Sequence, residues 1–234
     1  MKKKLLLMAL FILICLPTNT YALGKHLNID NSDCSNVLVI GDSRMDDLGV
    51  RVNSYKKKTR YSFNATRGGH YINRKEWITG QWKELNLMIS SPKYLKEQKE
   101  IVRNILRKHG SCTIIIVGTI NDIDEFDQIK ERKSLVRMAE LRRNLLAVKV
   151  RYKGITVSPH FYVASVIPSA RGKDARIKRV NAAIKKKYKS RYIDLGSYRY
   201  WLPYYTDGCH LNKKGCDILY NKISKFIKRN IKKH

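Results

Sequence analysis

The chain has 234 residues, with 48 Lys and Arg against 19 Asp and Glu, which gives a net charge of +29. It contains no internal repeat, low-complexity tract or Pro/Gly-rich linker, which excludes a repeat protein and favours one domain. The basic residues are spread along the whole chain without a nucleic-acid-binding motif, so we expect no specific nucleic acid partner. An anionic cell-wall polymer or lipid headgroup fits the charge. The alternative is a basic surface that binds no particular partner.

The N-terminus has the order of a secretory signal peptide: a basic cluster at 2–4, an apolar run at 5–16 and the small residue Ala22. The apolar run is shorter than the roughly 20 residues that a membrane-spanning helix needs. We therefore expect a signal peptide over residues 1–22 and a secreted or cell-surface domain over 23–234. The alternative is an uncleaved N-terminal membrane anchor.

Short apolar runs, most of them rich in β-branched residues, predict buried strands at 36–40, 61–63, 113–117, 161–167 and 192–195. Between them, apolar residues at helical spacing predict helices over 93–108 and 131–150. A third apolar stripe, from Leu219 to Ile231, predicts a C-terminal helix with Asn212 as its N-cap. Strands that alternate with helices favour an α/β fold with a mostly parallel sheet, and ligands bind such sheets beyond the carboxyl ends of the strands.

Polar residues follow two of these strands. Ser43 comes three residues after Ile40, and Asn121 follows the strand at 113–117. A serine on a tight turn after a buried strand can present its hydroxyl as a nucleophile. An asparagine at the same edge can donate a side-chain N–H to an oxyanion. Taken alone, each residue can equally cap a helix or a polar segment.

A third pair of polar residues precedes the C-terminal helix. Asp207 and His210 lie three residues apart in one loop, where the carboxylate can hold the imidazole as a base and stabilise its protonated form. The pair stands in the chain order that the other two motifs predict. Together the three motifs favour a serine hydrolase.

Gly-Asp-Ser at 41–43, Gly-x-x-Asn-Asp at 118–122 and Asp-x-x-His at 207–210 resemble the first, third and fifth sequence blocks of the SGNH (GDSL-like) hydrolases. The resemblance spans residues 37–231. It implies a three-layer, flavodoxin-like α/β fold with a parallel sheet of about five strands.

By this resemblance Ser43 is the nucleophile, His210 the general base and Asp207 the partner that orients the base. The oxyanion hole then comprises the Ser43 N–H, the Asn121 side chain and a glycine N–H from the second block. The chain supplies every group that this chemistry needs, so we expect no metal and no organic cofactor.

The second block matches Ala-Thr-Arg-Gly-Gly-His, in which Gly68 or the alternative Gly69 supplies the N–H. Arg44 stands where a leucine is frequent in the family, as in a Gly-Asp-Ser-Arg variant of secreted bacterial members. It puts a cation beside the nucleophile and close to the substrate. We expect His70 and His160 to be non-catalytic.

The implied activity is hydrolysis of an oxygen ester in a small-molecule or polymeric substrate, by a monomer. Export and the basic charge favour a small acyl group, acetyl above all, on carbohydrate or cell-wall polymer. Two other functions fit the same sequence. One is a lysophospholipase-like lipid esterase, and the other is a catalytically idle scaffold of the same fold that binds polyanions.

An even number of cysteines follows the predicted signal peptide: Cys34, Cys112, Cys209 and Cys216. Such a number in an exported protein favours disulfides. In the family's strand order the strands after Cys34 and Cys112 are neighbours, about 5 Å apart, so we expect these two to pair at the edge opposite Ser43. A Cys209–Cys216 bond would close a small loop around His210, and two free thiols are the alternative.

Overall fold

The structure is a computed structural model that describes residues 25–54, 61–67, 69–71, 74–78, 81–85, 88–123, 128–169 and 174–231. The expected signal peptide at 1–22 lies outside these residues, as does Gly68. Among the described helices, none combines the length and the apolar character that a membrane crossing requires.

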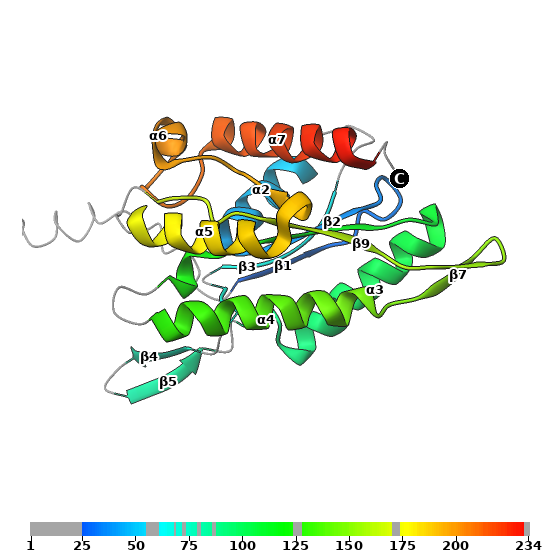
Figure 1. Ribbon diagram of the computed structural model, residues 1–234, viewed down its shortest axis with the longest axis horizontal. Coiled ribbons are helices and arrows are strands. Elements are labelled where there is room, and N and C mark those ends of the chain that lie inside the picture. The colour runs from blue at the N-terminus through cyan, green and yellow to red at the C-terminus, as the bar shows by residue number, and fades with distance from the viewer. Residues whose placement is uncertain are drawn as a thin grey trace, which may run out of the picture.

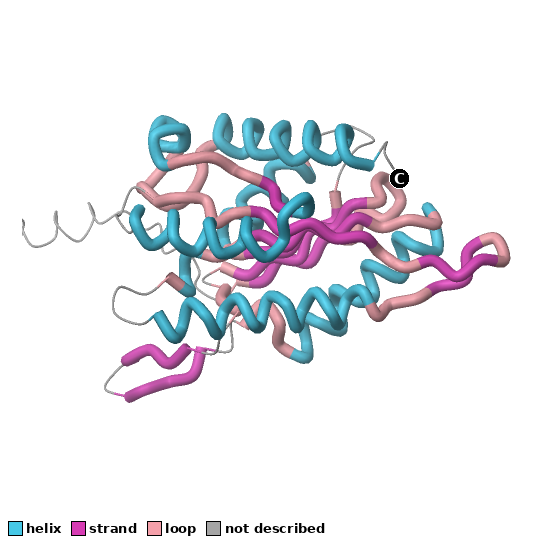
Figure 2. Tube along the Cα trace, viewed as in Figure 1, coloured by secondary structure: helices cyan, strands magenta, loops and turns pink. Residues whose placement is uncertain are grey.

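Six strands form the central sheet, in the spatial order β1-β3-β2-β6-β9-β10 (Figures 1 and 2). In that order the strands span His26–Ile29, Ser62–Thr66, Val37–Gly41, Thr113–Val117, His160–Ala164 and Tyr192–Ile193. The last five are parallel, whereas β1 pairs antiparallel with β3. Numbered along the chain, the parallel strands have the order 2-1-3-4-5, which is the flavodoxin-like arrangement. The predicted fold class is therefore confirmed, with β1 as an additional strand.

The helices form a layer on each face of the sheet (Figure 1). They are α2 (Ser43–Asn53), α3 (Pro92–His109), α4 (Gln128–Leu146), α5 (Asp174–Tyr188), α6 (Tyr198–Trp201) and α7 (Lys213–Ile231). Apolar side chains of α3, α4 and α5 share one core, which contains Ile114 and Ile116 of β6. Side chains of α2, α6 and α7 share the other, which contains Ile115 and Val117. Since both faces of β6 are buried, its sequence is a continuous apolar run.

Two hairpins project from this core, at opposite ends of the molecule in Figure 1. β4 (Arg74–Ile78) pairs with β5 (Gln81–Leu85), and β7 (Val150–Tyr152) pairs with β8 (Ile155–Val157). The second hairpin begins where the sequence predicts the end of a helix over 131–150. That helix ends at Leu146. The predicted N-cap of α7 is confirmed, because Asn212 Oδ1 accepts the Gly215 N–H at 2.9 Å.

The expected disulfides do not form. Cys34, Cys112, Cys209 and Cys216 all lie within the described residues, and no disulfide joins any of them. Cys34 lies in a turn ahead of β2, where its N–H bonds Asn31 O at 2.9 Å and its side chain is exposed. Cys112 is fully buried ahead of β6. The two side chains do not meet although β2 and β6 are neighbours, because Cys34 lies in the turn before β2 and not in the strand.

Candidate active site

Ser43 is the first residue of α2 and lies at the carboxyl end of β2. Asp42 is the N-cap of this helix, because its Oδ1 accepts the Arg44 N–H at 3.1 Å. The serine hydroxyl is therefore not needed to cap the helix, which was the alternative explanation for its position. The N–H of a first helical residue has no intrahelical acceptor. Both the hydroxyl and the N–H of Ser43 are thus free of helix-forming roles.

A hydrogen-bond network joins the ends of β2, β3 and β6 at this edge. The Thr119 hydroxyl lies 3.0 Å from Asp42 Oδ2 and 2.9 Å from the Gly69 carbonyl, and it donates its one proton to either oxygen. Its oxygen also accepts the Asn121 N–H at 3.1 Å. Thr119 was not among the residues to which the sequence assigns a role, although it follows a buried strand directly. The network brings the first, second and third motifs into contact.

Asn121 lies in a 3₁₀ turn, Ile120–Asp122, at the end of β6. Its Nδ2 donates to the Gly69 carbonyl at 3.0 Å. A side-chain amide carries two hydrogens, so this bond orients the group and leaves one hydrogen for an oxyanion. The Gly69 N–H is already donated to Thr66 O at 2.8 Å. That bond removes the alternative oxyanion donor Gly69, while Gly68 lies outside the described residues.

The position of Arg44 corrects the expectation that its cation lies close to the substrate. Its side chain is 1% exposed and does not face a substrate. The guanidinium donates to the carbonyl of Ile167 and, at 3.2 Å, to Asp42 Oδ2. Burial alone would lower the pKa of Arg44, but the Asp42 carboxylate, together with smaller effects of Cys209 and Tyr205, raises the pKa. The residue after the serine is therefore a buried cation that ties α2 to the segment after β9.

Asp207 and His210 make the predicted contact. Asp207 Oδ2 lies 2.8 Å from His210 Nδ1, while Oδ1 accepts the backbone N–H groups of His210 at 2.8 Å and Cys209 at 3.0 Å. Burial alone would raise the pKa of Asp207, but these hydrogen bonds and the imidazole charge lower it to about 2. The carboxylate is therefore ionised at neutral pH, where it can stabilise an imidazolium.

The segment after β9 anchors the loop that carries this pair. Tyr205 Oη donates to the carbonyl of Pro168, and Ser169 Oγ donates to the Gly208 carbonyl at 2.9 Å. Arg44 binds the same segment through Ile167. The sequence predicts only a strand here. The residues that follow the end of β9 supply two carbonyls: that of Ile167 binds α2, and that of Pro168 binds the loop of His210.

Charged residues also connect α2 with this loop. Asp47 lies one helical turn after Ser43, and Arg67 forms ion pairs with Asp47 and, at 2.5 Å, with Asp46. Burial raises the pKa of Asp47, and the charges of Arg67 and His210 act against that rise. An electrostatic interaction between Asp47 and His210 requires that the base loop lie near the first turns of α2.

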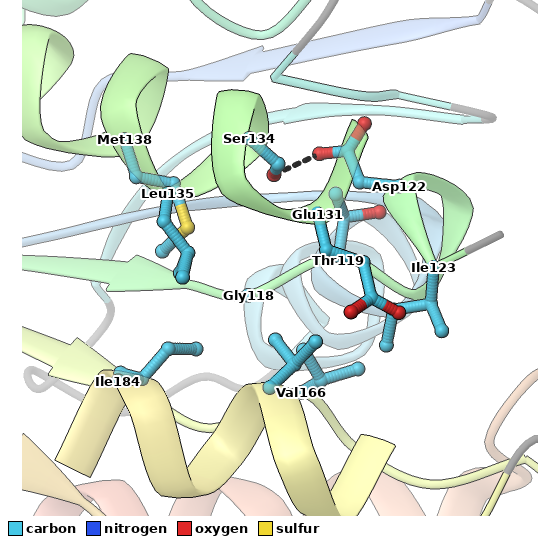
Figure 3. Close-up of a pocket in the computed structure, with 11 residues that line it drawn as sticks. Gly118, Thr119, Asp122, Ile123, Glu131, Ser134, Leu135, Met138, Val166 and Ile184 are labelled. Atoms are coloured by element: carbon cyan, nitrogen blue, oxygen red, sulfur yellow. Dashed lines mark hydrogen bonds between the residues drawn. The ribbon is translucent and has the colours of Figure 1, made fainter. Parts of the chain in front are cut away.

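A small cavity lies behind the third motif, between α4 and α5 (Figure 3). Its wall includes Gly118, Thr119 and Asp122, and the Ser134 hydroxyl donates to Asp122 at 2.6 Å. The cavity has a volume of about 10 Å³, which suits about one water molecule. It is too small for an acyl group.

His160 begins β9 at the opposite edge of the sheet from Ser43.

Two solved structures share this fold. A carbohydrate esterase family 3 enzyme from Talaromyces cellulolyticus covers 85% of this chain and 98% of its own, with a TM-score of 0.50 and 14% identity. Est24, a carbohydrate acetylesterase from Sinorhizobium meliloti, covers 82% and 98%, with a TM-score of 0.51 and 14% identity. No family model and no curated protein matches the sequence. At this identity the likeness establishes a three-layer α/β fold that esterases also use.

Proposed function

We propose that this protein is a secreted serine esterase that removes a small acyl group, acetyl above all, from a carbohydrate. Ser43 is the nucleophile, His210 the base and Asp207 its partner. The observation that carries the proposal is the double contact of Asp207 with the ring and the backbone of His210, at the sheet edge where Ser43 begins α2. A histidine held in this way is oriented as a base.

The proposed reaction gives each of these residues one role. Because Asp207 Oδ2 accepts from Nδ1, His210 Nε2 is left unprotonated and takes the Ser43 proton as Oγ attacks the ester carbonyl. The Ser43 N–H and the second Asn121 amide hydrogen stabilise the negative oxygen that forms. His210 then protonates the leaving alcohol. Water, deprotonated by His210, releases the acyl group as a carboxylic acid and restores Ser43.

Two observations support carbohydrate as the alcohol component. The two solved structures compared above are carbohydrate esterases, one of them an acetylesterase. The high positive charge favours association with anionic polymers over neutral lipid esters. The proposed export rests on the sequence of residues 1–22 alone.

The test is a series of aryl esters that differ only in acyl length, together with an acetylated polysaccharide. We expect kcat/KM to fall from acetyl to octanoyl and acetate to be released from the polymer. Faster cleavage of octanoyl esters would favour the lipid esterase. Binding to heparin with no turnover of any ester would favour the idle scaffold. Hydrolysis of an anionic polymer should fall with salt more steeply than that of a neutral aryl ester, since screening acts only on the charged substrate.

A further inference from the structure

A basic groove runs along the open edge of the sheet, between residues of α5 and α7. Figure 1 shows where these two helices lie. β10 is the last strand of the sheet, so one side pairs with β9 and the other faces this groove. The groove has a volume of about 390 Å³. Its cations are Lys185 on α5 and Lys222, Lys225 and Arg229 on α7, and Asp194 is the acid among its lining residues. Positive charge therefore lies on both walls.

Three of these cations lack the acidic partners that others on the surface have. Lys185, Lys225 and Arg229 are exposed, and none forms an ion pair with another described residue. Arg137, by contrast, lies 2.7 Å from Glu140. Like charges on facing walls repel one another. An anion between the walls would remove that repulsion.

Lys222 places a cation at a defined point of the groove. Its Nζ donates to the Leu195 carbonyl at 3.2 Å and lies 4.1 Å from the centre of the Tyr200 ring. Burial lowers the pKa of Lys222, against a smaller opposite effect of Asp194. An ammonium that is already oriented and partly dehydrated loses less freedom when an anion binds than a mobile surface lysine does.

The end of the groove at Lys222 adjoins the catalytic edge. The Leu195 N–H donates to Ser165 Oγ at 2.9 Å, and the Ser165 N–H donates to Ile193 O at 3.0 Å. Ser165 begins the segment that carries Ile167 and Pro168. A polymer that lies along α7 in this groove therefore reaches the edge of the sheet where Ser43 and His210 lie.

The remaining lining restricts the kind of polymer. Phe226 forms a T-shaped pair with Tyr162, with ring centres 4.9 Å apart, and both Phe226 and Tyr192 are half-buried, which limits the aromatic surface on which nucleic acid bases could stack. β10 has two residues, which is short for pairing with an added peptide strand. We propose that this groove binds an anionic polysaccharide, whose carboxylate or sulfate groups lie between the cations of α5 and α7. This site is separate from the ester-cleaving groups.

The test compares two triple charge reversals that alter net charge equally. The groove variant is Lys185→Glu, Lys225→Glu and Arg229→Glu. The control variant is Lys133→Glu, Arg143→Glu and Lys149→Glu, three exposed cations on or just after α4. Binding of heparin, as a sulfated probe, and of polygalacturonate, as a carboxylated one, is measured over a range of salt concentrations. Circular dichroism and the hydrolysis of a neutral aryl acetate report folding and the catalytic site.

We expect the groove variant to bind both probes at least about tenfold more weakly and to reduce the slope of log Kd against log salt by about two to three. The control should stay within about threefold of the unmodified protein, and aryl acetate hydrolysis should be unchanged in both. If the groove variant does not fold, Lys225→Gln with Arg229→Gln should give a smaller loss in the same direction.

Three results would overturn the proposal. Equal losses in the two triple variants would mean that net charge alone attracts the probes. Undiminished binding by the groove variant would place the contact elsewhere. Tighter binding of oligothymidylate or polyglutamate than of either polysaccharide, lost in the groove variant, would assign the groove to nucleic acid or to acidic peptide. Binding of the probes decides these comparisons and aryl acetate hydrolysis is only a control, so the groove and the proposed reaction fail independently.

Discussion

Asp207 holds His210 at two points, with Oδ2 2.8 Å from Nδ1 and Oδ1 2.8 Å from the backbone nitrogen. The spacing of three residues makes both contacts possible within one turn. The backbone bond fixes the carboxylate, and the carboxylate then fixes the plane and the tautomer of the imidazole. The same bonds make the stability of the fold depend on pH.

The pKa of Asp207 is lowered to about 2, from an ordinary value of about 3.9 in an unfolded chain. A carboxylate whose pKa is lower in the folded state stabilises the fold above the unfolded pKa and loses this effect as pH falls through the folded pKa. The melting temperature of Asp207→Asn should therefore lie below that of the unmodified protein at about pH 5, and the gap should close toward pH 2. Thermal melts across this range check it. A gap that widens between pH 5 and pH 2 would contradict the assignment.

Asn121→Ala should lower kcat by roughly 10²–10³-fold, because one preorganised donor to the oxyanion is lost. Asn144→Ala is the matched control, since its amide donates to Glu140 O at 3.1 Å on the exposed side of α4. Turnover of an aryl acetate at saturation measures both variants. A rise in KM with kcat unchanged would show that Asn121 binds substrate without stabilising the transition state.

Arg44→Met should destabilise the fold by about 3–5 kcal/mol, because it leaves the buried Asp42 carboxylate without its cation. Arg51→Met removes a pair with Asp217 whose side chains are 32% and 37% exposed, and it should cost much less, because solvent screens the pair. Urea denaturation gives both free energies of unfolding. Equal losses for the two variants would mean that burial does not distinguish the two pairs.

The sequence predicts those parts of the fold whose signal is local. Thr113–Val117 is a strand at its predicted bounds, since a run of β-branched residues buried on both faces has few other solutions. Asp207 and His210 were predictable as a pair because three residues in one turn determine their contact. The order of the motifs along the chain then identified the edge at which they meet.

Other features depend on distant contacts or on weak patterns. The burial of Arg44 depends on a carbonyl 123 residues away. β1 is an edge strand of four residues in which polar and apolar residues alternate, but a run this short is a weak signal, and its pairing with β3 defines it. α5 does carry a stripe, with Ile177, Val180, Ile184 and Tyr188 all buried, but basic residues surround it. Its spacing of three and four residues was the signal that could have revealed this helix.

The cysteines provide a test of the structure that needs no substrate. Cys34 is exposed and Cys209 is half-buried, so both should react with a thiol reagent in the folded protein. Burial raises the pKa of Cys216 to about 12 and raises that of Cys112 as well, so these two should react only after unfolding. Mass spectrometry of alkylated peptides gives the answer. A peptide that links Cys34 to Cys112 under non-reducing conditions would contradict the exposed position of Cys34.

The central claim is that Ser43 becomes acylated, and labelling with a fluorophosphonate tests it most directly. We expect one adduct, on the peptide that contains Ser43, together with loss of esterase activity. Ser43→Ala should take up no label and should lose on the order of 10⁴-fold or more in kcat on an aryl acetate, because the residual rate depends only on the oxyanion donors and on binding. A label on another residue, or undiminished turnover by Ser43→Ala, would contradict the account.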